Sequence, residues 1–198
     1  GDAGIGKTRL VEAATATPAD GSGADRDGLV LAGACLPLST MSVPLAPLRA
    51  ALRRAPPELR PPALSGAASQ EVTGGAPVLI DDWLERVCTR QPVVLVVDDL
   101  QWADESTLDV LMFVLAGSTD RRLAVLVTLR YGEIGTGHPL NRWLADMRRM
   151  PCVSKLSLGP LARHETRDQL AAIHGVTPHE SLVTEVFTRS GGNAYFNK

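Results

Sequence analysis

Apolar residues gather in three short runs, which are separated by segments with a helical pattern. The runs lie at residues 28–35, 93–97 and 123–129. They lack the alternation of a half-exposed strand, which is typical of strands that are covered on both faces in a parallel sheet. A further run at residues 153–158 predicts a fourth strand.

Between these runs, apolar residues recur at helical spacing. The predicted helices span residues 9–14, 47–54, 78–88, 107–116 and 139–150. Ser106 and Asp109 form a capping-box signal where the fourth of these helices starts. Proline, glycine and small residues predict loops over residues 36–48 and 61–75. The order of strands and helices predicts an α/β fold with a doubly wound parallel sheet.

Beyond Gly159-Pro160 the pattern changes to two helices without an intervening strand. They are predicted over residues 162–174 and 178–190, with Thr177 as the N-cap of the second. We expect this part of the chain to begin a helical subdomain.

The chain opens on Gly-Asp-Ala-Gly-Ile-Gly-Lys-Thr, which spells the phosphate-binding pattern G-x-x-x-x-G-K-T. Its glycines allow a tight turn whose backbone N–H groups, with the N-terminus of the next helix, face the phosphates of a nucleotide. Lys7 would reach the β- and γ-phosphates, and the Thr8 hydroxyl would ligate Mg²⁺. The alternative is a glycine turn that precedes a lysine by chance. The predicted nucleotide-binding residues are Gly1, Ala3, Gly4, Ile5, Gly6, Lys7, Thr8 and Arg9.

The chain starts abruptly at this motif. It has no initiator methionine, and the buried strand that normally precedes a phosphate-binding loop is missing. We therefore expect a fragment whose sheet lacks its first strand, with a gap or an adventitious pairing beside residues 123–129. The expected domains are a P-loop NTPase core over residues 1–158 and the beginning of a helical lid subdomain over residues 159–198.

Two acidic residues, Asp98 and Asp99, stand at the carboxyl end of the second predicted strand. Ligands bind at that edge of open α/β sheets, and two acids there are costly without a cation. Asp98 is placed to hold Mg²⁺, and Asp99 to orient or deprotonate an attacking water. Taken alone the pair also fits a strand-ending turn, but together with the phosphate loop it indicates a nucleoside triphosphatase.

Arg130 ends the third predicted strand and is expected at the same edge of the sheet. Two roles remain open for it: a sensor of the γ-phosphate that stabilises charge in the transition state, or a surface arginine paired with Glu133. Trp102 is predicted to pack under the site, and Asp104 to cap a helix or form a turn.

Composition narrows the function classes. The net charge of −2 suggests neither a nucleic-acid surface nor a membrane surface. Cys35, Cys88 and Cys152 are widely spaced without a C-x-x-C and are predicted to be buried thiols of a reducing cytoplasm. The four histidines lack metal-ligand spacing and are expected to face solvent. Neither a membrane span nor a signal peptide is predicted.

Four stretches now occur in order: Gly1–Leu10, Val-Leu-Val-Val-Asp-Asp-Leu-Gln-Trp-Ala-Asp at 94–104, Thr128-Leu129-Arg130, and Ser190-Gly191-Gly192-Asn193. Together they resemble the ATPase domain of the signal-transduction ATPases with numerous domains (STAND), an AAA-like class of P-loop NTPase. Within that class the chain is most similar to the large ATP-binding LuxR-type bacterial transcriptional regulators.

The resemblance implies an ATP-dependent switch with ATP and Mg²⁺ as cofactors. It assigns Lys7 to the phosphates, Thr8 and Asp98 to Mg²⁺, Asp99 to water activation and Arg130 to the sensor role. A complete member also carries helical repeats and a C-terminal helix-turn-helix domain. DNA would be a partner only through that domain, which this chain lacks, and homo-oligomers would form on activation.

One departure from the family concerns adenine. The family usually has Gly-Asn-Pro where this chain has Gly192-Asn193-Ala194, and that proline contacts the adenine side. We expect the exchange to affect adenine affinity and lid closure and to leave the phosphate chemistry unchanged.

Other NTPase classes fit less well. A GTPase would need an Asn-Lys-x-Asp motif, and this motif does not occur in the sequence. A transporter ATPase would place its Ser-Gly-Gly signature before the acidic strand, and nothing identifies the acceptor site of a small-molecule kinase. A scaffold that binds ATP without significant hydrolysis stays open. We expect slow turnover, because an arginine finger supplied in trans can be worth about 10³–10⁵ in rate.

Overall fold

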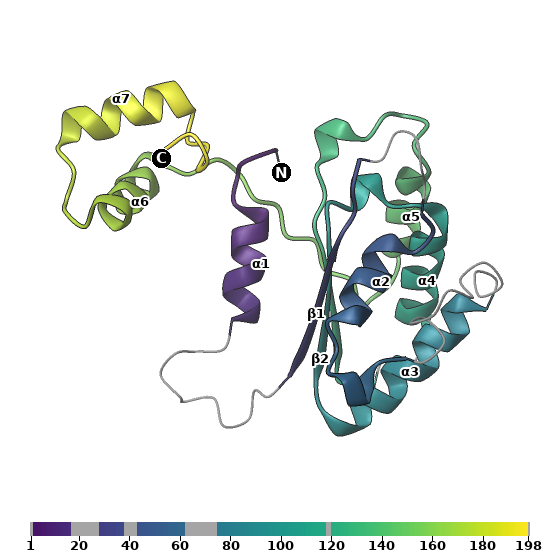
Figure 1. Ribbon diagram of the computed structural model, residues 1–198. Coiled ribbons are helices and arrows are strands. Elements are labelled where there is room, and N and C mark those ends of the chain that lie inside the picture. The colour runs from purple at the N-terminus through teal and green to yellow at the C-terminus, as the bar shows by residue number, and fades with distance from the viewer. Residues whose placement is uncertain (1, 17–27, 38–42, 62–74, 118–119, 198) are drawn as a thin grey trace. The chain divides into compact units, whose positions relative to one another are not determined.

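The computed structural model describes residues 2–16, 28–37, 43–61, 75–117 and 120–197 (Figure 1). The chain divides into two compact units. One combines Gly1–Leu10 with Lys155–Lys198, and the other is Val11–Ser154. Helix α1 (Lys7–Thr15) begins in the first unit and ends in the second.

The larger unit is built on a parallel sheet. Its strands are β1 (Leu29–Ala34), β2 (Val93–Asp98) and β3 (Leu123–Val127), in the order β1-β2-β3. Val93 pairs with Leu29 on one side and with Leu123 on the other, which sets the register of the sheet. The α/β fold with a parallel sheet, predicted from the three apolar runs, is therefore confirmed.

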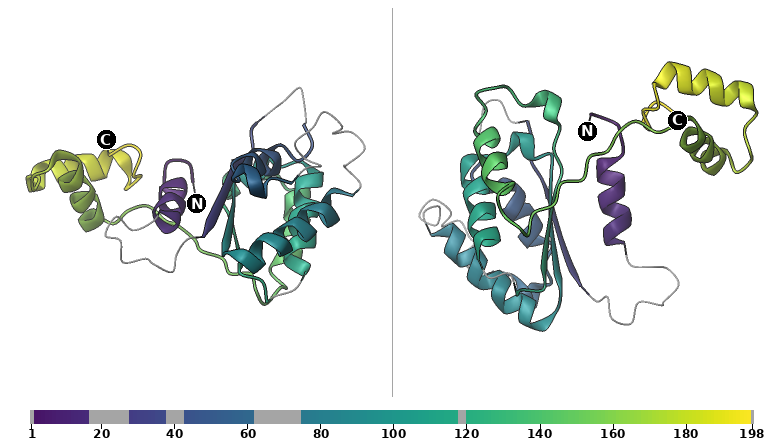
Figure 2. Two further views of the ribbon diagram at one scale, coloured as in Figure 1. Left: turned by 60° about the horizontal axis from the view of Figure 1, so that its bottom comes forward. Right: turned by 180° about the vertical axis from the view of Figure 1, so that it is seen from behind.

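Four helices cover one face of this sheet, as the views in Figures 1 and 2 show. They are α2 (Ala46–Arg53), α3 (Ala76–Arg90), α4 (Glu105–Ala116) and α5 (Pro139–Met147). The core lies between the helices and the sheet, where leucine and valine are excluded from water. Its fully buried side chains include Leu31, Leu48, Ile80, Leu84, Leu95, Val97, Leu111 and Leu140. The Trp143 indole N–H donates to the Leu108 carbonyl at 2.9 Å and joins α5 to α4.

The smaller unit contains the two helices predicted beyond residue 159. They are α6 (Arg163–His174) and α7 (Glu180–Ser190). Arg163 and Arg167 on α6 both form ion pairs with Glu180, the first residue of α7. Because all three side chains are substantially exposed, these pairs orient the helices more than they stabilise them.

The prediction of a strand over residues 153–158 is wrong. This stretch has no regular secondary structure, and Leu156 is 76% exposed. A strand needs a hydrogen-bonded neighbour. Among the described residues β3 pairs with β2 alone and is an edge strand of the sheet.

Two predicted helix caps are also wrong. Helix α4 is capped by Asp104, whose carboxylate accepts from the Thr107 N–H at 3.0 Å and from the Thr107 hydroxyl at 2.6 Å. Asp104 therefore replaces Ser106 as the cap, in line with its own predicted capping role. Helix α7 is capped by His179, which accepts from the Ser181 N–H at 3.3 Å, and Thr177 lies outside the helix.

The cysteines divide into two classes. Cys35 and Cys88 are buried as predicted, whereas Cys152 is exposed, so its predicted burial is wrong. It lies in the turn that follows α5, where no element covers it. Burial, and then the charges of Asp104, Asp99 and Asp98, raise the pKa of the Cys35 thiol to about 12. Burial likewise raises the pKa of Cys88.

Asp104→Ala should lower the free energy of unfolding by about 1–2 kcal/mol, because α4 loses its N-cap. The matched control is Asp109→Ala, which removes an exposed carboxylate of the same helix and should change stability by less than about 0.5 kcal/mol. Urea unfolding of both variants measures the difference. Equal losses in the two would show that the cap does not stabilise α4.

Iodoacetamide at pH 8 should modify Cys152 much faster than the other two cysteines, because the thiolate is the reactive form and needs access to the reagent. Peptide mass spectrometry over time measures the three rates. Cys152→Ser is the control and should leave the folded protein nearly unlabelled. Labelling of Cys35 at the rate of Cys152 would contradict its burial.

Candidate functional site

The predicted phosphate loop forms a tight turn that leads directly into α1. Gly4 and Gly6 have φ angles of +76° and +104°, a region that residues with a Cβ rarely adopt. Ile5, between them, is 8% exposed and anchors the loop. Lys7 begins α1, and its ammonium donates to the Asp2 carbonyl at 2.6 Å.

The turn and the helix together suit an anion. The first N–H groups of α1 form the positive end of its dipole, which favours phosphate. Thr8 and Arg9 lie in this first turn and are exposed, as are Ala3 and Gly4 in the loop. Gly1, the first of the predicted nucleotide-binding residues, lies outside the described residues.

The outer side of the loop is held by a segment far away in the sequence. The Asn193 side-chain amide donates to the Ala3 carbonyl at 2.9 Å, and the Tyr195 N–H donates to the Gly4 carbonyl at 3.0 Å. The sequence pointed to Asn193 through the Ser-Gly-Gly-Asn stretch and the Gly-Asn-Ala departure, and neither predicts a contact with the loop. Its contact with the loop could not be found by spacing, because 190 residues separate the partners.

The acidic pair stands in the larger unit, at the carboxyl end of β2. Asp98 is the last residue of the strand, and Asp99 follows with a φ of +55°, which is uncommon for a residue with a Cβ. Thr128, just after β3, holds both: its hydroxyl donates to Asp98 and accepts from the Asp99 N–H at 3.0 Å. This buried threonine fixes the two strand ends against each other.

Arg130 reaches the same place from β3. Its Nε and Nη2 donate to the two carboxylate oxygens of Asp99, each at 3.2 Å, and its Nη1 donates to Glu133 at 3.0 Å. The guanidinium also lies 5.1 Å from the centre of the Trp102 ring. The structure therefore contains the pairing with Glu133 that one of the two predicted roles required, together with a contact to Asp99 that neither had specified.

Charge compensation explains how these groups share a partly buried site. Partial burial lowers the pKa of Arg130, but the hydrogen bond to Glu133 and the charge of Asp99 outweigh it, so the pKa is raised overall. Arg130 is thus a fixed cation next to Asp99 at neutral pH. Of the predicted catalytic and metal residues, Asp98, Asp99 and Arg130 are brought together in one unit.

Gln101 is a member of this cluster that the sequence reasoning missed. It is 3% exposed; its amide Nε2 donates to Asp99 at 3.0 Å, and its Oε1 accepts from the Arg130 N–H at 3.1 Å. Both ends of the side chain are therefore satisfied. A glutamine within an apolar 3₁₀ turn next to two acids was the available signal, since buried polar groups need partners.

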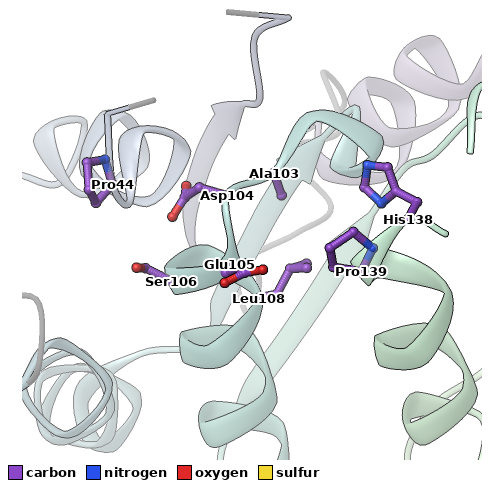
Figure 3. A pocket seen from close by; sticks show the side chains of 8 residues that line it. All are labelled: Pro44, Ala103, Asp104, Glu105, Ser106, Leu108, His138 and Pro139. Carbon is purple, nitrogen blue, oxygen red and sulfur yellow. The ribbon is translucent and has the colours of Figure 1, made fainter. Parts of the chain in front are cut away.

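A separate cavity of about 440 Å³ lies between the starts of α4 and α5 (Figure 3). Two of its polar side chains, Asp104 and His138, already form other hydrogen bonds. Asp104 caps α4 and also accepts from the Leu45 N–H, while the His138 Nδ1 accepts from the Leu140 N–H and caps α5. No residue predicted to bind a nucleotide lines it. The lining residues are Pro44, Ala103, Asp104, Glu105, Ser106, Leu108, His138 and Pro139.

Within the described part of the chain, no three His, Cys, Asp or Glu side chains are grouped to hold a metal ion by themselves. Three histidines, at positions 164, 174 and 179, are exposed as expected, and His138 is half-buried. None of the described helices is both long enough and apolar enough to cross a membrane.

Comparison with known proteins identifies the family of the chain. A family model described as the AAA ATPase domain matches residues 1–127, a stretch that holds both the phosphate loop and the acidic pair. No curated protein and no solved structure matches the chain significantly. Because the match covers more than half of the 198 residues, the chain belongs to the AAA ATPase domain family and is a P-loop NTPase of the AAA type.

Proposed function

We propose that this chain is the ATP-binding switch module of a multidomain regulator and that it hydrolyses ATP slowly. The observation that carries the proposal is the cluster at the end of β2, where Thr128 holds Asp98 and Asp99 and Arg130 pairs with Asp99. In a chain that also begins with a phosphate-binding loop, such a cluster would hold Mg²⁺ and activate water beside the bound nucleotide. Membership of the AAA ATPase family supports the ATP binding and is compatible with the hydrolysis.

The phosphate loop would bind the triphosphate tail. Its N–H groups and the start of α1 supply donors that are already oriented, so little ordering is required on binding. The Lys7 ammonium would exchange the Asp2 carbonyl for the β- and γ-phosphates, because a charged phosphate oxygen is a stronger acceptor than a neutral carbonyl. We include Gly1, Ala3, Gly4, Ile5, Gly6, Thr8 and Arg9 in this binding site.

Mg²⁺ fits the residues proposed to hold it. The Thr8 hydroxyl and the Asp98 carboxylate are oxygen ligands, and Mg²⁺ usually takes few protein oxygens and leaves the rest of its shell to phosphates and water. The ion would neutralise charge on the β- and γ-phosphates. Thr128 would keep the Asp98 carboxylate at a fixed orientation toward it.

Asp99 and Arg130 would supply the hydrolytic step. Asp99 would orient or deprotonate the attacking water, and Arg130 would sense the γ-phosphate. In this structure the guanidinium occupies both oxygens of Asp99. A γ-phosphate competes for that guanidinium, so arrival of ATP would release the carboxylate for water. This exchange offers a physical reason for slow turnover.

The alternative is a scaffold that is gated by ATP and does not hydrolyse it. One observation favours it: the carboxylate proposed as the base is held by both Gln101 and Arg130. If the γ-phosphate does not draw Arg130 away, Asp99 stays an ion-pair partner. Nucleotide binding would then be the whole function of the module.

The wider setting of the proposal comes from the resemblance to the STAND ATPases of the LuxR type. We propose an NTPase core over residues 1–158, a helical subdomain over residues 159–198, cytoplasmic location, and homo-oligomers on activation. DNA would be contacted through a separate helix-turn-helix domain in the complete regulator.

Lys7→Ala should weaken binding of Mg²⁺–ADP by about 100-fold or more, because a charge-assisted bond to phosphate is lost without replacement. Isothermal titration calorimetry measures the affinity. The matched control is Lys155→Ala, which removes an exposed lysine from the irregular segment 153–158 and should bind as the wild type does. Equal affinity of the Lys7 variant and the wild type would contradict the phosphate site.

Asp99→Asn should lower the rate of phosphate release from ATP by about 100-fold, in the range expected for loss of a general base, while ADP affinity changes little. A steady-state phosphate assay at saturating ATP measures the rate. Asp109→Asn, on the exposed side of α4, is the control for the same chemical change. Equal rates of the Asp99 variant and the wild type would leave only the scaffold.

A further inference from the structure

The segment 192–197, named here the strap, follows the C-terminus of α7 and lies against the phosphate loop within the smaller unit. Two of its groups contact the loop: the Asn193 side chain at Ala3 and the Tyr195 N–H at Gly4. Both contacts are made to carbonyl oxygens. The family match ends at residue 127 and does not include the strap.

These bonds fix the direction of the amides proposed to bind phosphate. In a trans peptide the carbonyl and the following N–H point in opposite directions, and every described peptide here is trans. When the Ala3 and Gly4 carbonyls are held toward the strap, the N–H groups of Gly4 and Ile5 face away from it. The strap thus keeps two donors turned outward and available to an anion.

The approach of the strap requires glycine in the loop. A Cβ on Gly4 would lie 2.7 Å from the Asn193 Oδ1 and 2.8 Å from the Tyr195 Cβ, both closer than real contacts allow. The second glycine of the pattern, Gly6, has open space around its Cβ position. Gly4 therefore serves the strap as well as the turn.

The strap is itself held by α6. The Gln169 amide Nε2 donates to the Ala194 carbonyl at 3.0 Å, and its Oε1 accepts from the buried Asn197 amide at 2.7 Å. One side chain on α6 therefore binds the strap at two points. A second tie joins the Leu161 N–H to the Gly192 carbonyl at 2.8 Å.

The two ends of the Asn193 side chain do different work. Its Oδ1 accepts from the Tyr195 N–H at 3.0 Å, which stabilises the turn of the strap, and its Nδ2 donates to the loop. If Asn193 only stabilised the turn of the strap, its Oδ1 alone would form a hydrogen bond. The donation to Ala3 is the part that reaches the phosphate loop.

We propose that Asn193 is a positioning residue for nucleotide phosphates, acting through the Ala3–Gly4 backbone, and that the strap couples this loop to α6 through Gln169. The inference rests on the proposed nucleotide binding and adds the means by which the helical subdomain senses it. Nucleotide affinity then depends on a side chain that touches no phosphate.

Asn193→Ala should weaken Mg²⁺–ADP binding by about 3- to 10-fold, the size expected for loss of one neutral hydrogen bond that orients the loop. Gln169→Ala should weaken it in the same direction, and the double variant should lose less than the product of the two, because both act through the strap. Calorimetric titration gives the affinities. Thermal melting without nucleotide should stay cooperative for Asn193→Ala, with a lower midpoint because two hydrogen bonds are lost.

Asn141→Ala is the matched control. Like Asn193→Ala, it removes a side-chain amide that donates to the backbone. The Asn141 amide donates to the carbonyls of Gly135 and Thr136, in a turn with no proposed nucleotide contact. Its ADP affinity should equal that of the wild type. Wild-type binding that is unchanged by Asn193→Ala would overturn the inference and leave the proposed function standing, whereas absence of ADP binding by the wild type would overturn both.

A second measurement does not depend on variants. The Tyr195 amide donates to the loop, so its hydrogen exchange in the wild type should slow when Mg²⁺–ADP orders that loop. Exchange followed by mass spectrometry on peptides covering residues 191–197 measures this. An exchange rate that ADP leaves unchanged, in protein saturated with the nucleotide, would contradict the coupling.

Discussion

The structure of the larger unit depends on how two carboxylates are accommodated at the end of a buried strand. Asp98 ends β2 and Asp99 follows it, and Val93, Leu95 and Val97 of the same strand belong to the core. Without partners these charges would be strongly unfavourable there. Thr128 bonds to one side chain and to the backbone of the other, and Arg130 neutralises Asp99. The ends of β2 and β3 are thereby joined by polar contacts as well as by the sheet.

The ion pair between Arg130 and Asp99 also determines the proposed chemistry. A carboxylate that is neutralised by an arginine is a stable resting arrangement, and a phosphate can exchange with it because both compete for one guanidinium. The phosphate loop shows a comparable logic: Lys7 rests on a backbone carbonyl, and the strap keeps the loop amides directed outward. In both places the nucleotide would replace an existing partner, which favours a switch over a rapid catalyst.

The sequence predicted much of this fold because its signals are local. Apolar runs located β1, β2 and β3, and helical spacing located the helices to within a few residues. The strand prediction for residues 153–158 was wrong because a strand depends on a hydrogen-bonded neighbour, which composition does not reveal. Ser106 failed as a cap because Asp104 makes the better bonds from two positions earlier. The contacts of Gln101 with Arg130 and of Asn193 with Ala3 were missed because these partners are distant in the sequence.

We propose that the phosphate loop and the acidic pair act on one bound metal–nucleotide complex. Paramagnetic broadening by Mn²⁺–ADP, read in the amide NMR spectrum of the wild type, tests it most directly. We predict broadening of the Lys7 and Thr8 amides together with those of Asp98 and Asp99 at the same substoichiometric Mn²⁺, and recovery of all four when Mg²⁺ displaces the Mn²⁺. Broadening confined to the loop, with Asp98 and Asp99 unaffected in protein saturated with ADP, would contradict it.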